Sequence, residues 1–350
     1  MSFVTHEDVN KYLYEYATEF DLHKLISFGS KITQLTVPSG DFDRKNGENY
    51  PSSLSRITLQ WETDDNNSDE NSRRGSSCFE DIFDAVIICN GHYALPSSPG
   101  IPGLEYFKGR VIHSIQYDTP SDFADQVVLC VGGRASGSDL AREISEYAKH
   151  VYLSDSTFPF QLDKDTAEKS SMKLGNVDWV PRTEYIDSKS CIYFGDECEK
   201  CPNDVDVIIF CTGYDYNFPF INDKSNLELS VVPGERRVTP LFEQLWHAKE
   251  PSISFIGLQH SVVPFPFFEL QAEAVVSQIL GSAPNPLPDK HKRILAAEKD
   301  SNSGGPCDTN RVQDTHYLGN FQWDSQRRYA QLAGIYNNEW EDYISTSRVS

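Results

Sequence analysis

The chain has 350 residues with a net charge of -21, and 39% of its residues are hydrophobic, so it is long and apolar enough for two or three globular domains. The negative charge argues against nucleic acid or an anionic membrane surface as the main partner. Eight cysteines are too few for a disulfide scaffold, which favours a reducing, cytoplasmic environment. The polar N-terminus and the absence of any run near the ~20 apolar residues that span a bilayer predict no signal peptide and no membrane anchor.

The first ninety residues have the pattern of a helix followed by strands. The pair Thr5 and Asp8 resembles a capping box, and apolar residues after it recur at helical spacing. The predicted elements are a helix at 6–20 and strands at 25–37, 54–62 and 83–89. The stretch 64–77 is almost without apolar residues and predicts a solvated loop or a disordered insertion.

The centre of the sequence predicts a strand, a tight turn, a helix and a second strand between residues 127 and 154. Gly132 allows the tight turn, Gly137 allows the helix to pack closely on the strand, and the first amides of the helix can hold a pyrophosphate. Arg134 stands where the usual G-x-G-x-x-G pattern has its middle glycine, and an ordinary βα turn is the alternative reading. The candidate cofactor-binding residues of this turn are Gly132, Arg134, Ala135, Ser136 and Gly137.

Two stretches far apart in the chain, 84–93 and 206–215, repeat one pattern. Each has an acidic residue, a buried strand, a small polar residue, a glycine and an aromatic residue. Both strands are expected to end at the cofactor edge of a sheet, where ligands of open α/β folds lie. This adds four candidate cofactor-binding residues: Asn90, Gly91, Thr212 and Gly213.

The rest of the chain offers few chemical signals. The pattern predicts a strand at 252–257, a helix at 267–280 and one or two helices in 327–343, with little regular structure in 155–203. Cys198 and Cys201 form a C-x-x-C pair, but no second ligand pair accompanies it and acidic neighbours disfavour a thiolate. We therefore predict no metal site, and no acid–base dyad identifies a catalytic side chain.

The pattern Phe107-x-Gly109-x-x-x-His113-x-x-x-Tyr117 matches, at each fixed position, the identifying motif of the flavin-containing monooxygenases, and the chain resembles that family. The turn at 132–137 looks like the second dinucleotide motif of the family, in the form found in its plant-type, sulfur-oxygenating branch. Other segments that resemble the family are 89–93, 211–220, 255–271 and 315–323.

The resemblance implies an α/β fold with two Rossmann-like dinucleotide-binding domains that hold FAD and NADP. It also implies NADPH-dependent oxygenation by dioxygen of a small molecule with a soft nucleophilic N or S, through a flavin C4a-hydroperoxide. In such a protein His113 and Tyr117 lie near the junction of the two domains and support the cofactors, which makes His113 a further candidate cofactor-binding residue.

The chain departs from the family pattern in three places. No G-x-G-x-x-G unit for FAD precedes His6, so we expect a truncated FAD domain that binds FAD weakly. Arg134 replaces a glycine, and the strand after the turn ends at Ser154 and Asp155 without a basic residue. The Asp155 carboxylate favours a ribose 2′-hydroxyl, whereas Arg134 offers a positive charge to a 2′-phosphate. NADP is the predicted cofactor on the strength of Arg134 and the resemblance.

The predicted domain order places the NADP domain inside the FAD domain. Residues 1–118 are expected to belong to the FAD domain, 119–203 to the NADP domain, and 204–350 to the return of the FAD domain and a C-terminal segment. Two alternatives stay open: a non-catalytic NADP-binding remnant, and a disulfide-reductase-like flavoenzyme that uses Cys198 and Cys201. The sequence leaves the substrate and the oligomeric state undetermined.

Overall fold

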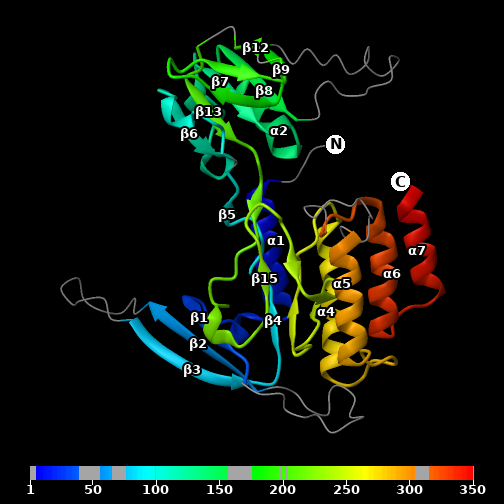
Figure 1. Ribbon diagram of the computed structural model, residues 1–350. Coiled ribbons are helices and arrows are strands. Elements are labelled where there is room, and N and C mark those ends of the chain that lie inside the picture. The colour runs from blue at the N-terminus through cyan, green and yellow to red at the C-terminus, as the bar shows by residue number, and fades with distance from the viewer. Residues whose placement is uncertain are drawn as a thin grey trace.

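The structure is a computed structural model that describes residues 5–38, 56–64, 76–98, 100–156, 176–197, 199–201, 204–303 and 315–349. The described chain forms two parts (Figure 1). A sheet with one helix lies at the top of the view, and a larger part with further sheets and most of the helices lies below it. In the described part of the chain, no helix is long and apolar enough to cross a bilayer.

A parallel sheet with the strand order β6-β13-β7-β8-β9 forms the upper part. Its strands are β6 (Arg110–His113), β13 (Val207–Phe210), β7 (Val127–Val131), β8 (His150–Asp155) and β9 (Val177–Pro181). Two of them, β6 and β13, come from outside the predicted segment 119–203, on either side of it. The assignment of 119–203 as a domain stays a prediction.

Both faces of this sheet are covered. Helix α2 (Ala135–Ile144) packs Ile144 on one face, against a core that includes Val128. The other face carries Leu129 and meets a small antiparallel sheet. That sheet contains β10 (Thr183–Ile186), β11 (Ile192–Phe194) and β12 (Glu199–Lys200). Because alternate residues of each strand face two cores, β7 and β13 read as unbroken apolar runs.

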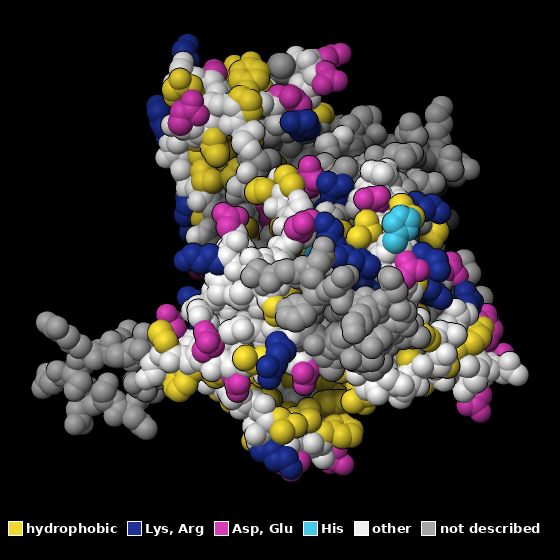
Figure 2. All heavy atoms as spheres, turned by 60° about the horizontal axis from the view of Figure 1, so that its bottom comes forward, with side chains coloured by type: hydrophobic (Ala, Val, Ile, Leu, Met, Phe, Trp, Pro, Cys, Tyr) yellow, Lys and Arg dark blue, Asp and Glu magenta, His cyan; other side chains and the backbone are white. Residues whose placement is uncertain are grey.

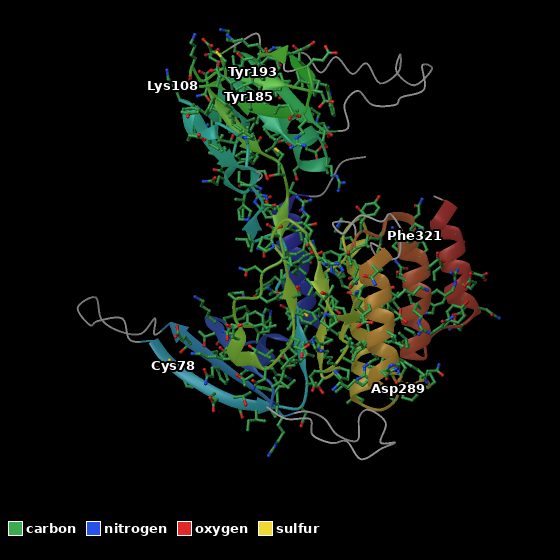
Figure 3. The ribbon with its side chains drawn as sticks, in the orientation of Figure 1. Cys78, Lys108, Tyr185, Tyr193, Asp289 and Phe321 are labelled. Atoms are coloured by element: carbon green, nitrogen blue, oxygen red, sulfur yellow. The ribbon has the colours of Figure 1, made fainter. Side chains whose placement is uncertain are left out.

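The small sheet β10-β11-β12 corrects the expectation of little regular structure in 155–203. Its residues Ile186, Ile192 and Phe194 are buried against the parallel sheet. Because the side chains that bury them are distant in the sequence, the local pattern of apolar residues does not indicate these strands. Tyr185 and Tyr193 stack with ring centroids 4.5 Å apart at 8°, on the part of the molecule shown at the top of Figure 3.

Two strand-to-strand connections join the upper and lower parts. After β4 (Val86–Ile88) the chain enters β5 (Leu95–Pro96), and after β13 it enters β14 (Tyr214–Asp215). Strands β5 and β14 pair with each other, and the backbone N–H of Ser97 donates to the Gly213 carbonyl at 2.9 Å. The two stretches that share a sequence pattern therefore run side by side.

The lower part has three sheets in the described residues. The one nearest the connections has the order β17-β18-β19-β4, and β19 runs parallel to β4. The second has the antiparallel order β1-β2-β3, and the third pairs β15 with β16. Their bounds are β1 (Ser30–Thr36), β2 (Ile57–Asp64), β3 (Ser76–Phe83), β15 (Ser230–Val231), β16 (Val238–Thr239), β17 (Leu241–Phe242), β18 (Trp246–His247) and β19 (Ile253–Phe255).

Two expected elements of this region differ from the structure. The single strand expected at 83–89 is divided, because β3 ends at Phe83 and β4 begins only at Val86 after a bend at Asp84. Within the polar stretch 64–77, residues 65–75 lie outside the described residues, while 76–77 already belong to β3. Strand β3 is long because it pairs with β2 along its whole length.

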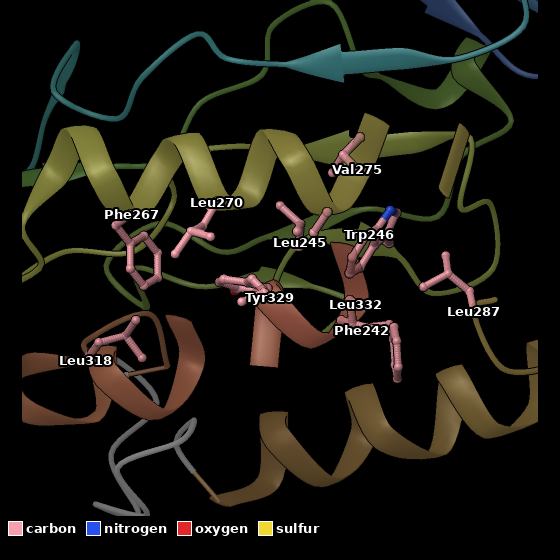
Figure 4. Packing of buried hydrophobic residues seen from close by; sticks show 12 residues of the cluster. Phe242, Leu245, Trp246, Phe267, Leu270, Val275, Leu287, Leu318, Tyr329 and Leu332 are labelled. Atoms are coloured by element: carbon pink, nitrogen blue, oxygen red, sulfur yellow. The ribbon is translucent and has the colours of Figure 1, made fainter. Parts of the chain in front are cut away.

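Helices α4, α5, α6 and α7 lie together on one side of the sheets of the lower part, and α1 lies near the middle of the molecule (Figure 1). A core of α4, α6 and the β17–β18 hairpin buries Trp246, Phe267 and Leu270 almost completely (Figure 4). The α-helices are α1 (His6–Glu19), α4 (Pro264–Ile279), α5 (Lys290–Ser303), α6 (Gln322–Ala333) and α7 (Asn338–Val349). One-turn 3-10 helices occur at His23–Leu25, Leu104–Tyr106, Ser114–Gln116, Pro120–Phe123, Asp223–Ser225 and Gly319–Phe321.

Helix α1 begins as expected, with the Thr5 side chain accepting from the Asp8 N–H at 3.3 Å. Its apolar face, however, is not buried, and Leu13 and Phe20 are 49% and 59% exposed. The Tyr12 ring stacks on Phe265 at the start of α4, with centroids 5.4 Å apart.

Figure 2 shows another face of the molecule, where described Lys and Arg side chains are interspersed with Asp and Glu.

Candidate dinucleotide-binding site

The turn between β7 and α2 needs glycine at two of its positions. Gly132 has φ +108°, and a Cβ there would lie 2.7 Å from the Cys211 carbonyl oxygen. A Cβ on Gly137 would lie 1.7 Å from the Gly132 carbonyl oxygen. These contacts bring the turn, the first helical turn of α2 and the end of β13 together as closely as backbones can approach.

The start of α2 has the features of a helix N-terminus that can hold an anion. Arg134 is the N-cap and, among the described residues, makes no side-chain cap bond. The helix leaves the amides of its first turn, at Ala135, Ser136 and Gly137, without intrahelical acceptors. The Ser138 hydroxyl donates to the Gly133 carbonyl at 2.9 Å and fixes the turn from inside. The positive end of the helix dipole and these amides fit a pyrophosphate.

Asp155, the last residue of β8, lies directly against this turn. It is 9% exposed, and a Cβ on Gly133 would lie only 2.0 Å from its Oδ2 atom. The Arg134 side chain, by contrast, is exposed. The structure therefore brings the five turn residues and Asp155 to one place, although their roles in binding a cofactor stay predictions.

A second group of candidate residues lies where the two connections cross. His113 is 5% exposed, and its Nδ1 accepts from the Ile115 N–H at 3.2 Å. Its Nε2 therefore carries the proton and donates to the Gly213 carbonyl at 3.0 Å. Burial lowers the pKa of His113, which favours this neutral form. The Thr212 hydroxyl donates to the Ser97 carbonyl, and the Arg236 guanidinium donates to the Thr212 carbonyl.

Asn90 and Gly91 occupy the corresponding place after β4. The Asn90 amide donates to the Asn217 carbonyl at 3.0 Å, so it ties one connection to the other. Gly91 has φ +71° and open space where a Cβ would be. Tyr117 lies elsewhere, beside α2, and its hydroxyl donates to Glu143 Oε2 of that helix at 2.8 Å. Of the two residues expected at the domain junction, His113 contacts the crossing connections and Tyr117 anchors the following segment to the helix.

A cavity of about 360 Å³ opens beside Gly91, between β4, β19 and the start of α4. Its walls include Gly91, His92, Gly257, Gln259, His260 and Phe268. His92 Nδ1 lies 2.9 Å from the Gly257 carbonyl, while Nε2 is buried and has no partner among the described residues. Burial lowers the pKa of His92, so Nδ1 donates and Nε2 is a free acceptor. The volume lies in the range of small-molecule sites.

Sequence reasoning missed most of this cavity. His92 and Gly257 are 165 positions apart and meet only because β4 and β19 are neighbouring parallel strands. A signal was available in the sequence: Gly257, like Gly91 and Gly213, follows a short apolar strand, and the structure gives all three a positive φ. Gly91 and Gly257 end neighbouring strands of one sheet, and Gly213 follows a strand of the other sheet. Such strand–glycine endings are where ligands of α/β folds lie.

Of the C-x-x-C pair, the described residues include Cys201. Cys201 is buried in the core between the small sheet and the parallel sheet, and its N–H donates to the Ile192 carbonyl at 2.8 Å. Cys198 lies outside the described residues.

A parallel sheet with a glycine turn, an open helix N-terminus and an acidic residue at the end of the next strand defines a Rossmann-like dinucleotide-binding protein. A model of the flavin-binding monooxygenase-like family matches residues 1–172 and 165–322. The chain belongs to this family, and its α/β fold with two Rossmann-like units is the one expected.

Two of its relatives come from the plant Arabidopsis thaliana. Flavin-containing monooxygenase FMO GS-OX-like 2 of Arabidopsis thaliana is 31% identical over 290 residues, which are 81% of this chain and 55% of the relative. GS-OX-like 8 of the same plant is 28% identical over 350 residues, which are 99% of this chain and 69% of the relative. The chain thus spans about half to two thirds of the length of these relatives.

Solved structures show the same fold. The S-allyl-L-cysteine S-oxygenase from Allium sativum superposes with a TM-score of 0.77 at 26% identity, over 99% of this chain and 71% of that chain. Tmm from a Pelagibacter strain superposes with a TM-score of 0.67 at 18% identity, over 97% of this chain and 68% of that chain, and supports the fold alone.

Proposed function

We propose that this chain is the polypeptide of a flavin-dependent monooxygenase that uses a reduced nicotinamide dinucleotide and dioxygen to oxygenate a soft nucleophilic S or N of a small molecule. The observation that carries the proposal is the β7–α2 turn, where Gly132 and Gly137 leave no room for a side chain and the first helical amides stay open. Membership of the flavin-binding monooxygenase-like family supports the reaction class. An S-oxygenase among the structural neighbours favours sulfur as the acceptor atom.

The turn would hold the nicotinamide dinucleotide. Amides of Ala135, Ser136 and Gly137 would bind the pyrophosphate, with Gly132 allowing its close approach. Asp155 lies where an acidic residue meets the adenosine ribose.

The cavity beside Gly91 fits the ring system of FAD. Its volume suits a fused ring, and the unpartnered Nε2 of His92 can accept a hydrogen bond from a ring N–H. Bound flavin would supply the activation of dioxygen, and the nicotinamide would supply the hydride. The protein's part is to keep the two rings aligned: His113 and Arg236 hold the Thr212–Gly213 connection, which links the cavity to the turn.

A non-catalytic nicotinamide-binding protein is the second candidate. It is favoured by one observation: among the described residues, α2 is the only helix that follows a strand and a glycine turn of this kind. The described residues therefore contain one turn of the kind that holds a pyrophosphate, whereas a complete enzyme holds two dinucleotides.

Reconstitution of the purified chain with FAD separates the two candidates. Bound flavin is measured by absorbance after gel filtration, and S-allyl-L-cysteine and N,N-dimethylaniline serve as probe substrates. Sulfoxide or N-oxide formed in proportion to the NADPH or NADH consumed would support the monooxygenase. Bound dinucleotide without retained flavin would support the binding protein, and retention of neither would contradict both.

Substitution of His92 by phenylalanine tests the cavity. We expect FAD affinity, titrated by quenching of flavin fluorescence, to fall about fivefold, because one hydrogen bond to the ring is lost while the ring volume is kept. His23→Phe removes an exposed histidine beside Tyr14 and should leave FAD affinity unchanged. Equal affinity of wild type and His92→Phe would show that flavin does not meet this side chain.

A further inference from the structure

The adenosine end of the dinucleotide site contains a fixed acidic group. Asp155 pairs with Pro181 at the end of β8, and the preceding residue, Ser154, is held on three sides. The Gly132 N–H donates to the Ser154 carbonyl at 2.8 Å, the Ser154 hydroxyl donates to the Pro181 carbonyl at 3.0 Å, and it accepts from the Thr183 N–H at 2.9 Å. The backbone that carries Asp155 is therefore locked to both the turn and the next strand.

The Asp155 carboxylate is directed at the turn itself. Its Oδ2 atom would lie 2.0 Å from a Cβ on Gly133, so the carboxylate lies beside the Gly133 backbone. A dinucleotide whose pyrophosphate lies on the α2 amides places its adenosine ribose at the end of the second strand. A carboxylate at this place accepts hydrogen bonds from ribose hydroxyls and repels a 2′-phosphate.

The positive charge of Arg134 should attract a 2′-phosphate only weakly, because the Arg134 side chain lies in water. Its side chain is exposed, whereas Asp155 is 9% exposed. A charge interaction in water is several times weaker than one across a partly buried site, and an exposed long side chain also loses rotamer entropy when it is fixed. The carboxylate should therefore outweigh the guanidinium in selecting the nucleotide.

We propose that Asp155 is a specificity-determining residue that makes this site accept NADH at least as tightly as NADPH. The inference rests on the proposed function, because it assumes that the β7–α2 turn holds a nicotinamide dinucleotide. It differs from the sequence-based prediction of NADP, which gives the charge of Arg134 the larger weight.

Binding measurements on the purified chain test this without catalysis. Isothermal titration with NADH and NADPH gives the two dissociation constants, and adenosine 2′-monophosphate and adenosine 5′-monophosphate probe the ribose end alone. Wild type should bind NADH as tightly as NADPH or more tightly. Asp155→Asn should shift the ratio toward NADPH by about tenfold or more, because the repulsion of the 2′-phosphate is removed. Arg134→Ala should shift the ratio toward NADH by a factor of only about two or three.

The matched control is Asp139→Asn. Asp139 lies on α2 with its side chain 60% exposed in an ion pair with Arg142, so the change removes one charge from the same unit but away from the turn. It should leave the ratio unchanged. Circular dichroism verifies folding, and Asp155→Thr replaces Asp155→Asn if the latter is unfolded.

Two outcomes overturn the inference: NADPH binding clearly tighter in the wild type, or an unchanged ratio in the Asp155 variants. Failure of the wild type to bind either dinucleotide would instead overturn the proposed function, and this inference with it.

Discussion

Replacement of Gly137 by valine is expected to abolish dinucleotide binding. The first added atom would lie 1.7 Å from the Gly132 carbonyl oxygen, and that atom belongs to the backbone of the binding turn. Leu153 of β8 is 3.3 Å from the same position on the other side. Relief of the overlap requires α2 to move off the sheet, which displaces the amides that bind the pyrophosphate. We expect at least a hundredfold loss of affinity for NADH and NADPH, measured by isothermal titration.

The control is Gly100→Val, because Gly100 has nothing within 4 Å of an added Cβ. It should keep wild-type affinity. Thermal unfolding followed by circular dichroism shows whether Gly137→Val is folded. A folded Gly137→Val variant that binds NADPH or NADH like the wild type would contradict the assignment of the site.

The second large effect expected is a loss of stability in mild acid caused by His316. This side chain is 1% exposed behind the cavity, with Nε2 accepting from the Val238 N–H at 3.0 Å and Nδ1 lying 3.1 Å from Gln244 Oε1. Burial is the main cause that lowers the pKa of His316 to about 3, and the basic groups nearby, Arg237 among them, act in the same direction. The folded protein therefore keeps His316 neutral.

The unfolded chain takes up this proton near its ordinary pKa of about 6.5. The stability contributed by the neutral ring is complete above that pH and is lost progressively as the pH falls from about 6.5 toward about 3. The loss amounts to about 4 kcal/mol of unfolding free energy over the whole range. Urea titrations at several pH values measure it.

The variant His316→Gln provides the comparison, because an amide can replace both hydrogen bonds of the ring but does not titrate. Its unfolding free energy should depend less steeply on pH between 6.5 and 3 than that of the wild type. His291→Gln removes an exposed histidine on α5 and should retain the wild-type slope. Parallel curves for wild type and His316→Gln would show that His316 is not the source of the acid sensitivity.

The local order of residues determined the central unit of this protein. Its signals are local: an apolar run at 127–131, glycines at 132 and 137, and apolar residues at helical spacing after them. Each of these features specifies its element through residues that are near in the sequence. The pattern from Phe107 to Tyr117 identified the family in the same way. The shared pattern of 84–93 and 206–215 predicted two strands followed by similar connections. The pairing of β5 with β14 shows that these connections run side by side, although β4 and β13 belong to different sheets.

Only the tertiary structure decided how these units meet. Strand β13 lies between β6 and β7, although about 75 residues separate it from β7 in the sequence, and this order sets Gly132 against Cys211. The contact of Asp155 with Gly133 and that of His92 with Gly257 likewise depend on which strands are neighbours. Hydrophobic patterning specifies that a strand is buried but not beside which strand it lies, because any apolar partner of suitable length satisfies it. The strand order, and with it the position of each side chain in the site, is fixed by the packing of the whole chain.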